Sequence, residues 1–327
     1  MNLPDGAGPY VIGARSPQCI GEAKMGNNEL PKLGRLRVQA VLYGNEPDSI
    51  LRTVQHLDRA AELAVQIGAF GQVTLAYGDS SPTDSLRSVV EDAKATCSTL
   101  ADVEYVHFGK NMGSAGGHNA LMELGQTDFT ILMNPDIMFA PDALIELARP
   151  FVDPSVGMSE PKQLPFEHPK EYNPSSGETP WASGACTLVR RAVLSELEGY
   201  DARTFFLYCD DVDLSWRARL KGYKLIYCPH AAVFHDKRMQ FGGERPVGWA
   251  EKFYSAEAGL LMAYKYCRDD RVKQIATFFA ESGDQVWLDA LASFEKRRED
   301  GTLPDRLDPD HKVAYFRDGL YARHRYV

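Results

Sequence analysis

The sequence lacks the features that mark membrane, nucleic-acid-binding and disulfide-stabilised proteins. No apolar run approaches the roughly twenty residues needed to span a bilayer, and the N-terminus MNLPDGAGPYVIGARS has neither the charged start nor the apolar core of a signal peptide. Acidic residues (45) outnumber Lys and Arg (36) and no long basic run is present, which argues against a nucleic-acid surface. The six cysteines form no Cys-x-x-Cys pair, so neither a zinc site nor a disulfide framework is indicated. We therefore expect a cytoplasmic chain with no nucleic-acid partner.

What is present is an ordinary globular composition, 44% hydrophobic and 25% charged over 327 residues, which is enough for one large core or two modest ones. Residues 1–34 are rich in Gly, Pro and Asn and are expected to form a partly irregular extension. The main domain is expected over residues 35–248. Apolar residues recur at helical spacing within 249–327, which predicts a helical C-terminal region whose aromatic side chains offer a surface to a second copy of the chain.

Short apolar runs alternate with helical patterns in the first part of the main domain. The runs LRVQAVLYG, QVTLAYGD, VEYVHFG and DFTILMNPD have the composition of buried strands, and amphipathic segments separate them. This alternation predicts an α/β fold with an open, parallel sheet, in which ligands bind at the carboxyl ends of the strands. After Phe151 the chain becomes rich in proline, which predicts loops and a substrate-facing lid before the next helix.

Polar residues and glycines follow these predicted strands where each one ends. Asp79 lies at the end of QVTLAYGD, before the turn residues SSPTD, where a carboxylate can accept hydrogen bonds from a ribose or a base. A helix N-cap is the simpler alternative for this residue. Gly113, Gly116 and Gly117 in KNMGSAGGHNALMELG allow close backbone approach at a helix start suited to phosphate. Structural packing explains these glycines equally well.

The segment ILMNPDIMF fixes one carboxylate, that of Asp136, at the end of a strand. Hard cations such as Mg²⁺ and Mn²⁺ are commonly held by one or two carboxylates together with substrate phosphates. The segment therefore predicts a divalent metal site, with an Asx turn before the helix near Pro141 as the alternative.

The stretch FFLYCDDVDLSWRARLKGYKLIYCPHAAVFH brings together Asp210, Asp211 and Asp213, with His235 at its end. Three neighbouring acids in apolar surroundings are costly unless they are paired, protonated or held by a cation. A divalent ion bound by Asp136 and His235 would reduce that cost. Asp210 or Asp211 could then act as an ionised general base, while Asp213 complements the helix dipole.

In their order along the chain, these segments resemble the inverting family 2 glycosyltransferases of the GT-A fold, and particularly the bacterial rhamnosyltransferase-type members. The resemblance covers roughly residues 35–235 and is carried by VLYGNEPDSILRTVQHL, YGDSSPTDSL, NMGSAGGHNAL, MNPDIMF, WASGACTLVRRAVLSELEGYD and the acidic stretch. Each segment is a weak signal and the ordered set is specific. It implies a Rossmann-like, mainly parallel sheet flanked by helices, followed by a helical C-terminal extension.

The resemblance also implies a role for each candidate residue. Asp211 matches the carboxylate that deprotonates the acceptor hydroxyl, with Asp210 as its neighbour and rival. Asp136 matches the last Asp of the metal-binding DXD motif, and His235 a late histidine that reaches the metal or diphosphate, which implies a divalent cation, Mg²⁺ or Mn²⁺. The first DXD position is a neutral Asn here. The implied donor-binding residues are Tyr43, Asp79, Asn111, Gly113, Gly117, Asn119, Asn134, Trp181, Ser183 and Gly184.

The implied reaction is a single displacement with inversion. The donor would be a dTDP- or UDP-linked sugar, with rhamnose as a candidate, and the acceptor a hydroxyl of a bacterial glycan or of a lipid-linked glycan. A lipid-linked acceptor would bring the protein to the inner face of the cell membrane.

Three alternatives accompany this interpretation. A dinucleotide-dependent oxidoreductase shares the α/β layout but requires several glycines in the first strand-to-helix turn, where YGNEPDS has one. A non-catalytic sugar-nucleotide-binding protein on the same fold is favoured by the neutral Asn134. At the level of residues, the acids could simply form a helix N-terminus paired with Arg217 and Arg219, followed by a structural histidine.

Overall fold

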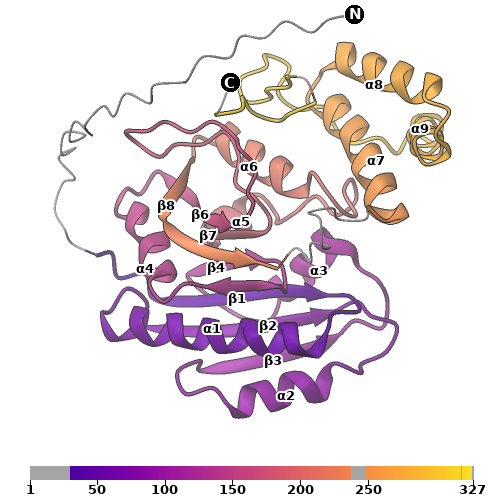
Figure 1. The fold of residues 1–327 in the computed structure, drawn as a ribbon. Coiled ribbons are helices and arrows are strands. Elements are labelled where there is room, and N and C mark those ends of the chain that lie inside the picture. Colours follow the sequence, from indigo (N-terminus) through magenta and orange to yellow (C-terminus); the bar gives the residue numbers. More distant parts are fainter. Residues whose placement is uncertain (1–29, 237–246, 318, 326–327) are drawn as a thin grey trace, which may run out of the picture.

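Apolar runs of the sequence form one central β-sheet, shown in Figure 1. The computed structural model describes residues 30–236, 247–317 and 319–325. Most of the predicted extension 1–34 therefore lies outside the described residues. The strands are β1 (Arg35–Leu42), β2 (Gln72–Asp79), β3 (Asp102–His107), β4 (Phe129–Met133), β5 (Ile137–Phe139), β6 (Val156–Leu164), β7 (Cys186–Arg190) and β8 (Lys224–His235).

The sheet is mixed, with the strand order β3-β2-β1-β4-β7-β6-β8-β5. β1 pairs in parallel with both β2 and β4, and β2 pairs in parallel with β3. β7 runs antiparallel to β4 and β6, whereas β6 and β8 are parallel. The α/β prediction is confirmed, and the carboxyl ends of β1, β2 and β4 meet at one edge of the sheet, as expected of parallel neighbours.

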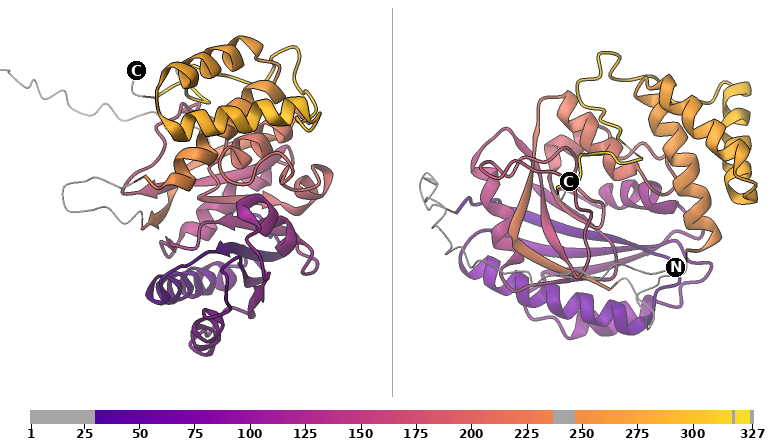
Figure 2. Two further views of the ribbon diagram at one scale, coloured as in Figure 1. Left: turned by 90° about the vertical axis from the view of Figure 1, so that its right-hand side faces the viewer. Right: turned by 45° about the horizontal axis from the view of Figure 1, so that its top comes forward.

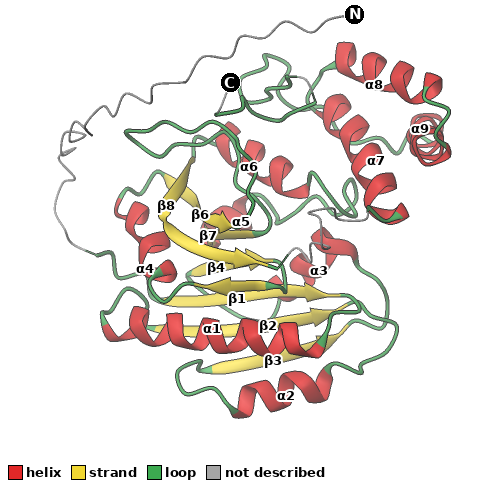
Figure 3. Ribbon diagram, in the orientation of Figure 1, coloured by secondary structure: helices red, strands yellow, loops and turns green. Residues whose placement is uncertain are grey.

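Helices cover both faces of the sheet (Figure 3). One face packs against α1, α2 and α4, and the other against α3, α5 and α6. Pro47 stands in the first turn of α1, where its missing N–H costs nothing, and the apolar residues of this helix recur at helical spacing and are buried. The helices are α1 (Pro47–Gln66), α2 (Arg87–Ala95), α3 (Gly113–Met122), α4 (Ala143–Ala148), the 3₁₀ helix η1 (Arg149–Val152), α5 (Arg191–Glu196) and α6 (Asp210–Leu220).

The proline-rich region after Phe151 holds the predicted loops in part, since residues 165–185 form only turns, loops and isolated bridges. It also contributes two central strands of the sheet, β6 and β7, and the helix α5. Pro161 lies inside β6, at the point where the pairing with β8 shifts register between Pro161 and Lys162. A register shift relieves the strand of a regular hydrogen bond, so a residue without an N–H is tolerated there. The strands β6 and β7 were therefore not predicted, whereas the substrate-facing lid stays a prediction.

The C-terminal region packs on α6, above the sheet in the left view of Figure 2. Its helices share one apolar cluster with Trp216 of α6, whose ring meets Tyr266, Phe316 and Tyr321 edge to face. The predicted helical pattern ends at Glu299, and the described residues that follow form no helix. Among the described residues, none of the helices has the length and apolar character needed to cross a bilayer. The helices are α7 (Trp249–Lys265), α8 (Asp269–Glu281) and α9 (Gln285–Glu299).

Candidate active site

The first part of the site is the edge where β1 and β2 end. The amide of Ser80 donates to the carbonyl of Leu42 (2.9 Å), and the amide of Gly44 donates to Ser81 Oγ (3.0 Å). These bonds place the turn after β2 beside Tyr43, whose side chain is 58% exposed. An exposed aromatic ring at the carboxyl end of a strand is available for stacking on a ligand.

Asp79 is fully buried beneath this edge. Its Oδ1 accepts the Ser81 amide (2.8 Å) and its Oδ2 accepts the hydroxyl of Tyr105 (2.5 Å). Burial, and then the bond to Asp79, raises the pKa of Tyr105, so the phenol stays protonated and donating. Asp79 therefore shapes the turn at the end of β2, and its predicted contact with the donor would use the remaining lone pairs of the carboxylate.

The second part of the site joins the end of β4 to the end of β8. β5 pairs antiparallel with β8 and sets Ile137 opposite His235, which brings the preceding Asp136 to the same histidine. His235 Nε2 lies 3.2 Å from Asn134 Nδ2 and 3.4 Å from Asp136 Oδ1, and His235 Nδ1 lies 3.3 Å from Gln163 Oε1. The structure thus brings together the two predicted metal ligands and the predicted donor residue Asn134.

The chemistry of this group fits a divalent cation. If Nδ1–H of His235 donates to Gln163, the Nε2 lone pair faces the carboxylate of Asp136, and the two repel each other unless a proton or a cation lies between them. Among the described residues no group of three or more His, Cys, Asp or Glu side chains could hold a metal ion. The protein would therefore supply two ligands, and the other ligands would have to come from the donor or from water.

The predicted phosphate loop lies at the start of α3. Gly113 has a φ of +66° and a side chain there would begin 2.3 Å from the carbonyl oxygen of Phe206, so only glycine fits. Its amide donates to Asn111 Oδ1 (3.0 Å), and the amide of Ser114 donates to Phe206 O (3.0 Å). These two amides have partners within the chain. Phosphate binding by Asn111 and Gly113 remains a prediction that needs other groups of the loop.

Gly117 and Asn119 make structural contacts. A Cβ at Gly117 would lie 2.7 Å from Val41, so the glycine lets α3 pack closely on β1. The side-chain amide of Asn119 donates to Tyr200 O (2.8 Å) and accepts from Tyr200 N (2.9 Å), which fixes the turn before α6. Their predicted contact with the donor stays untested, and packing accounts for the residue types.

Asp210 and Asp211 open α6 in contrasting environments. Tyr208 and Cys209, both with positive φ, turn the chain sharply just before the helix. Asp210 is buried, and burial together with the charge of Asp211 raises its pKa to about 7, against a hydrogen bond from Ser114 that lowers it. Asp211 is partly exposed, and its oxygens accept the amides of Gly184 (2.7 Å) and Val212 (2.8 Å). Asp211 is thus the better placed of the two to act as an ionised base.

Asp213 belongs to the core and not to the site. It is fully buried, and its carboxylate contacts Lys265 Nζ (2.6 Å) and Arg217 Nε (2.7 Å) and accepts from the hydroxyl of Tyr266 (3.1 Å). Its main role is to join α6 to α7, with two cations to offset the cost of burying the charge.

The loop 181–185 connects the two acidic groups. Its amide at Gly184 donates to Asp211, and its carbonyl at Ala185 accepts the amide of Asn134 (2.9 Å). A Cβ at Gly184 would lie 3.1 Å from the Cβ of Asp211, so a larger residue would press on that side chain. The candidate base Asp211 and the segment that follows β4 therefore bond to the same loop.

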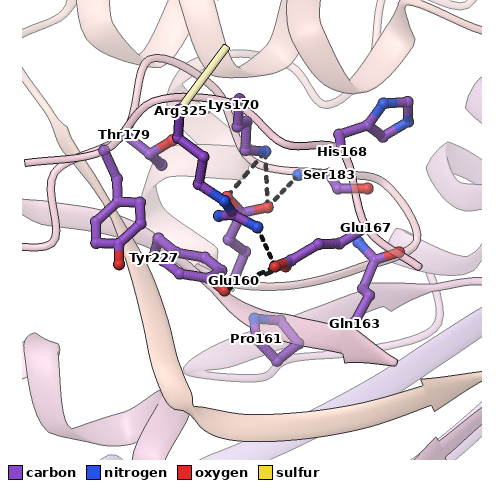
Figure 4. A pocket seen from close by; sticks show the side chains of 11 residues that line it. Glu160, Pro161, Gln163, Glu167, His168, Lys170, Thr179, Ser183, Tyr227 and Arg325 are labelled. Atoms are coloured by element: carbon purple, nitrogen blue, oxygen red, sulfur yellow. Dashed lines mark hydrogen bonds and ion pairs between the residues drawn. The ribbon is translucent and has the colours of Figure 1, made fainter. Parts of the chain in front are cut away.

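Two charged residues in this area were missed by sequence reasoning. Glu160 of β6 accepts the amide of Ser183 on Oε2 (2.8 Å) and pairs with Lys170 (2.8 Å), and both side chains are buried. The Lys170 ammonium also lies 3.6 Å from the ring centroid of Trp181. Figure 4 shows Glu160 and Lys170 pointing toward each other in the pocket, with Ser183 beside them. A lone acid inside the apolar run VGMSEPKQL was the available signal.

The mixed sheet with helices on both faces is an α/β architecture of the GT-A class, the fold found in many glycosyltransferases. A mannosyltransferase from Pyrobaculum calidifontis, solved in complex with GDP-Man and Mn²⁺, superposes with a TM-score of 0.55 at 17% identity, covering 83% of this chain and 76% of that one. At this identity the likeness supports the fold alone.

Sequence comparisons identify the family. The model for Glycosyl transferase family 2 matches residues 43–161, and that for Glycosyltransferase like family 2 matches residues 172–245. The N-acetylglucosaminyl-diphospho-decaprenol L-rhamnosyltransferase of Mycobacterium tuberculosis is 26% identical over 254 residues, covering 63% of this chain and 78% of that protein. The O-antigen chain rhamnosyltransferase WbaN of Salmonella anatum is 25% identical over 180 residues, covering 48% and 55%. The chain belongs to glycosyltransferase family 2 and is a rhamnosyltransferase-like enzyme, as its sequence motifs predicted.

Proposed function

We propose that the protein transfers a sugar, with rhamnose as the leading candidate, from a nucleoside-diphosphate donor to a hydroxyl of a glycan or lipid-linked acceptor, with inversion at the anomeric carbon. The observation that carries the proposal is the loop 184–185, which bonds to Asp211 on one side and to Asn134 on the other. A base and a diphosphate-binding group held by one loop can act on the two faces of one sugar.

The donor would lie along the edge formed by β1, β2 and β4. Tyr43 would stack on the base, and Asp79 would accept a hydrogen bond from the base or ribose. The diphosphate would reach Asp136 and His235, which would hold a divalent ion, Mg²⁺ or Mn²⁺. When bound, that ion supplies positive charge to the leaving diphosphate.

Asp211 would act as the general base. The acceptor hydroxyl gives its proton to the Asp211 carboxylate while its oxygen attacks the anomeric carbon, and the bond from that carbon to the diphosphate oxygen breaks on the opposite face. One carboxylate is sufficient for this single displacement, which inverts the anomeric centre. General base catalysis of this kind contributes about 10²- to 10⁴-fold.

The relatives suggest the class of donor and acceptor. Two of them are named as rhamnosyltransferases, one acting on an N-acetylglucosaminyl-diphospho-decaprenol and the other on an O-antigen chain. On this basis we infer a dTDP- or UDP-linked donor and an acceptor that belongs to a bacterial cell-wall or surface glycan. A lipid-linked acceptor would place the reaction in the cytoplasm at the inner face of the membrane.

The proposal is tested by release of free nucleoside diphosphate. Purified protein is first screened by thermal shift with UDP-, dTDP- and GDP-sugars with and without Mn²⁺, because a ligand that binds the folded state raises its stability. The stabilising donor is then incubated with candidate acceptors. We expect acceptor-dependent release that Asp211→Asn abolishes while the thermal shift by the donor persists. A fully active Asp211→Asn variant would move the base to Asp210 or refute the mechanism.

A further inference from the structure

We propose that the buried pair Glu160–Lys170 is a positioning device for the general base, acting through the backbone of the loop 183–184. The inference rests on the proposed function, because it takes Asp211 as the base. It assigns a role to two residues that the sequence motifs did not indicate and that the loop links to Asp211 by hydrogen bonds, beside a charge interaction of Lys170 with Asp211.

The first step is the path of contacts. Lys170 Nζ pairs with Glu160 (2.8 Å), Glu160 Oε2 accepts the amide of Ser183 (2.8 Å), and the next amide, that of Gly184, donates to Asp211 Oδ2 (2.7 Å). Two consecutive amides therefore donate to two carboxylates that come from different elements, β6 and α6. Because adjacent peptide planes share one Cα, fixing the amide at 183 restricts the direction of the amide at 184.

The second step is that the pair contacts the loop at two points, beside its other hydrogen bonds, which include Thr187 Oγ1 to Ser183 O (2.6 Å). The Ala182 amide donates to Ser215 Oγ (3.0 Å), and the Ala185 amide donates within the loop to Ser183 Oγ (3.3 Å). The ring of Trp181 lies over the Lys170 ammonium at 3.6 Å, so the same pair contacts the loop at its start and at Ser183. An ammonium over an indole face is attracted by the ring's negative potential.

The third step is the free-energy cost of burying the charges of Glu160 and Lys170. Glu160 is 2% exposed and Lys170 is 8% exposed, and burial raises the pKa of Glu160 and lowers that of Lys170 against their mutual attraction. Replacing a buried ion pair by apolar side chains of similar volume is often neutral or stabilising. Stability alone is therefore a weak reason for this pair, whereas the placement of a catalytic carboxylate is a specific one.

The test compares two double variants that differ only at position 160, where Gln keeps an acceptor for the Ser183 amide and Met does not. Glu160→Met with Lys170→Met removes the charges and the acceptor for Ser183. Glu160→Gln with Lys170→Met removes the charges and keeps a carbonyl oxygen for Ser183. Tyr227→Phe is the control, since it removes a hydroxyl that bonds Glu167 in the same pocket and keeps the bonds of Glu160 to Ser183 and Lys170.

We expect the Met/Met variant to lose about 10- to 100-fold in kcat with little change in donor KM, as small misplacements of catalytic groups do. The acidic limb of its kcat–pH profile should move to higher pH, because a carboxylate that loses an N–H donor becomes a weaker acid. The Gln/Met variant should keep most of the wild-type kcat and the wild-type position of the acidic limb. Tyr227→Phe should change neither quantity.

The inference is overturned if the Met/Met variant keeps both kcat and the pH limb, or if the Gln/Met variant folds and still loses both. The second outcome decides the question even when the Met/Met variant fails to fold. Failure of the proposed function would look different, since the wild-type protein would then release no nucleoside diphosphate or Asp211→Asn would remain active.

Discussion

The two neighbouring aspartates at the start of α6, Asp210 and Asp211, lie in different environments. Asp210 is buried between α3 and α6, and Asp211 is partly exposed and held by two amides. Only the second is accessible to an acceptor hydroxyl, and two amides hold its carboxylate in place. Neighbouring acids in a sequence can therefore have separate functions that their spacing does not reveal.

The environment of Asp210 predicts a pH-dependent stability. Its pKa rises from 3.8 to about 7 on folding, so the folded state holds a proton that the unfolded state has lost, and this contribution to stability falls as the pH rises from about 4 to about 7. Asp210→Asn mimics the protonated form at every pH. We expect its melting temperature relative to wild type to be higher at pH 8 than at pH 5, measured by thermal denaturation. A constant difference across this range would contradict the assignment.

Substitution of Gly184 by alanine should lower the activity and leave the stability of the fold nearly unchanged. A methyl group there would lie 3.1 Å from the Cβ and 3.3 Å from Oδ2 of Asp211, so Gly184→Ala should displace the base and lower kcat by about 10- to 100-fold. Steady-state kinetics and thermal denaturation measure the two effects. Gly71→Ala is the matched control, because its nearest neighbour would be at 3.6 Å and it lies at the start of β2.

Among the elements, β8 decides whether a metal site exists. His235 is the last residue of β8, and the pairing of β8 with the short strand β5 brings it to Asp136, which lies 99 positions earlier. His235→Ala should therefore remove most of the Mn²⁺-dependent part of the stabilisation by the donor, and leave the metal-independent part. The exposed His230 on the same strand provides the control His230→Ala. Equal Mn²⁺ responses in both variants would contradict the metal site.

The sequence predicted the elements whose signals are local. The strands ending at Leu42, Asp79 and Met133 are apolar runs closed by polar residues, and both the fold and the family followed from them and from the motif order. β6 was missed because Pro161 was counted among the proline-rich loops, and the tolerance for it arises from a register shift with β8 that only the assembled sheet creates. Local pattern contains no information on that partner.

The candidate site shows the same division. Asp136, His235 and Asp211 were identified from motifs, whereas Glu160 and Lys170 have roles only through contacts that join separate elements. For Asp213, the sequence suggested a place in the helix dipole, but its main partner Lys265 lies in a helix that the motifs do not cover. Long-range ion pairs of this kind leave no periodic signal in the sequence.

For the molecule as a whole, the buried contact between Asp213 and Lys265 is the main polar link from α6 to the C-terminal helices. Lys265→Met should lower the free energy of unfolding by about 3 kcal/mol, because it leaves a buried carboxylate with one cation fewer. Urea denaturation measures the change. Asp213→Asn added to Lys265→Met should restore part of it, since the buried carboxylate that lost one of its two cations is removed, and no recovery would show that the loss arises from packing or from the ion pair of Lys265 with Asp201.

The helix α6 has its first turn in the candidate active site and Trp216 in the C-terminal cluster, where Tyr321 also reaches back to Cys209 with its hydroxyl 3.0 Å from the sulfur. A chain cut at residue 248 would thus expose the indole of Trp216 to water and remove Lys265 from the buried carboxylate of Asp213. Both residues lie in α6, the helix that also carries Asp210 and Asp211. We expect such a fragment to be insoluble or inert, so that the expected boundary between 35–248 and 249–327 marks a change of architecture and not a point at which the enzyme can be divided.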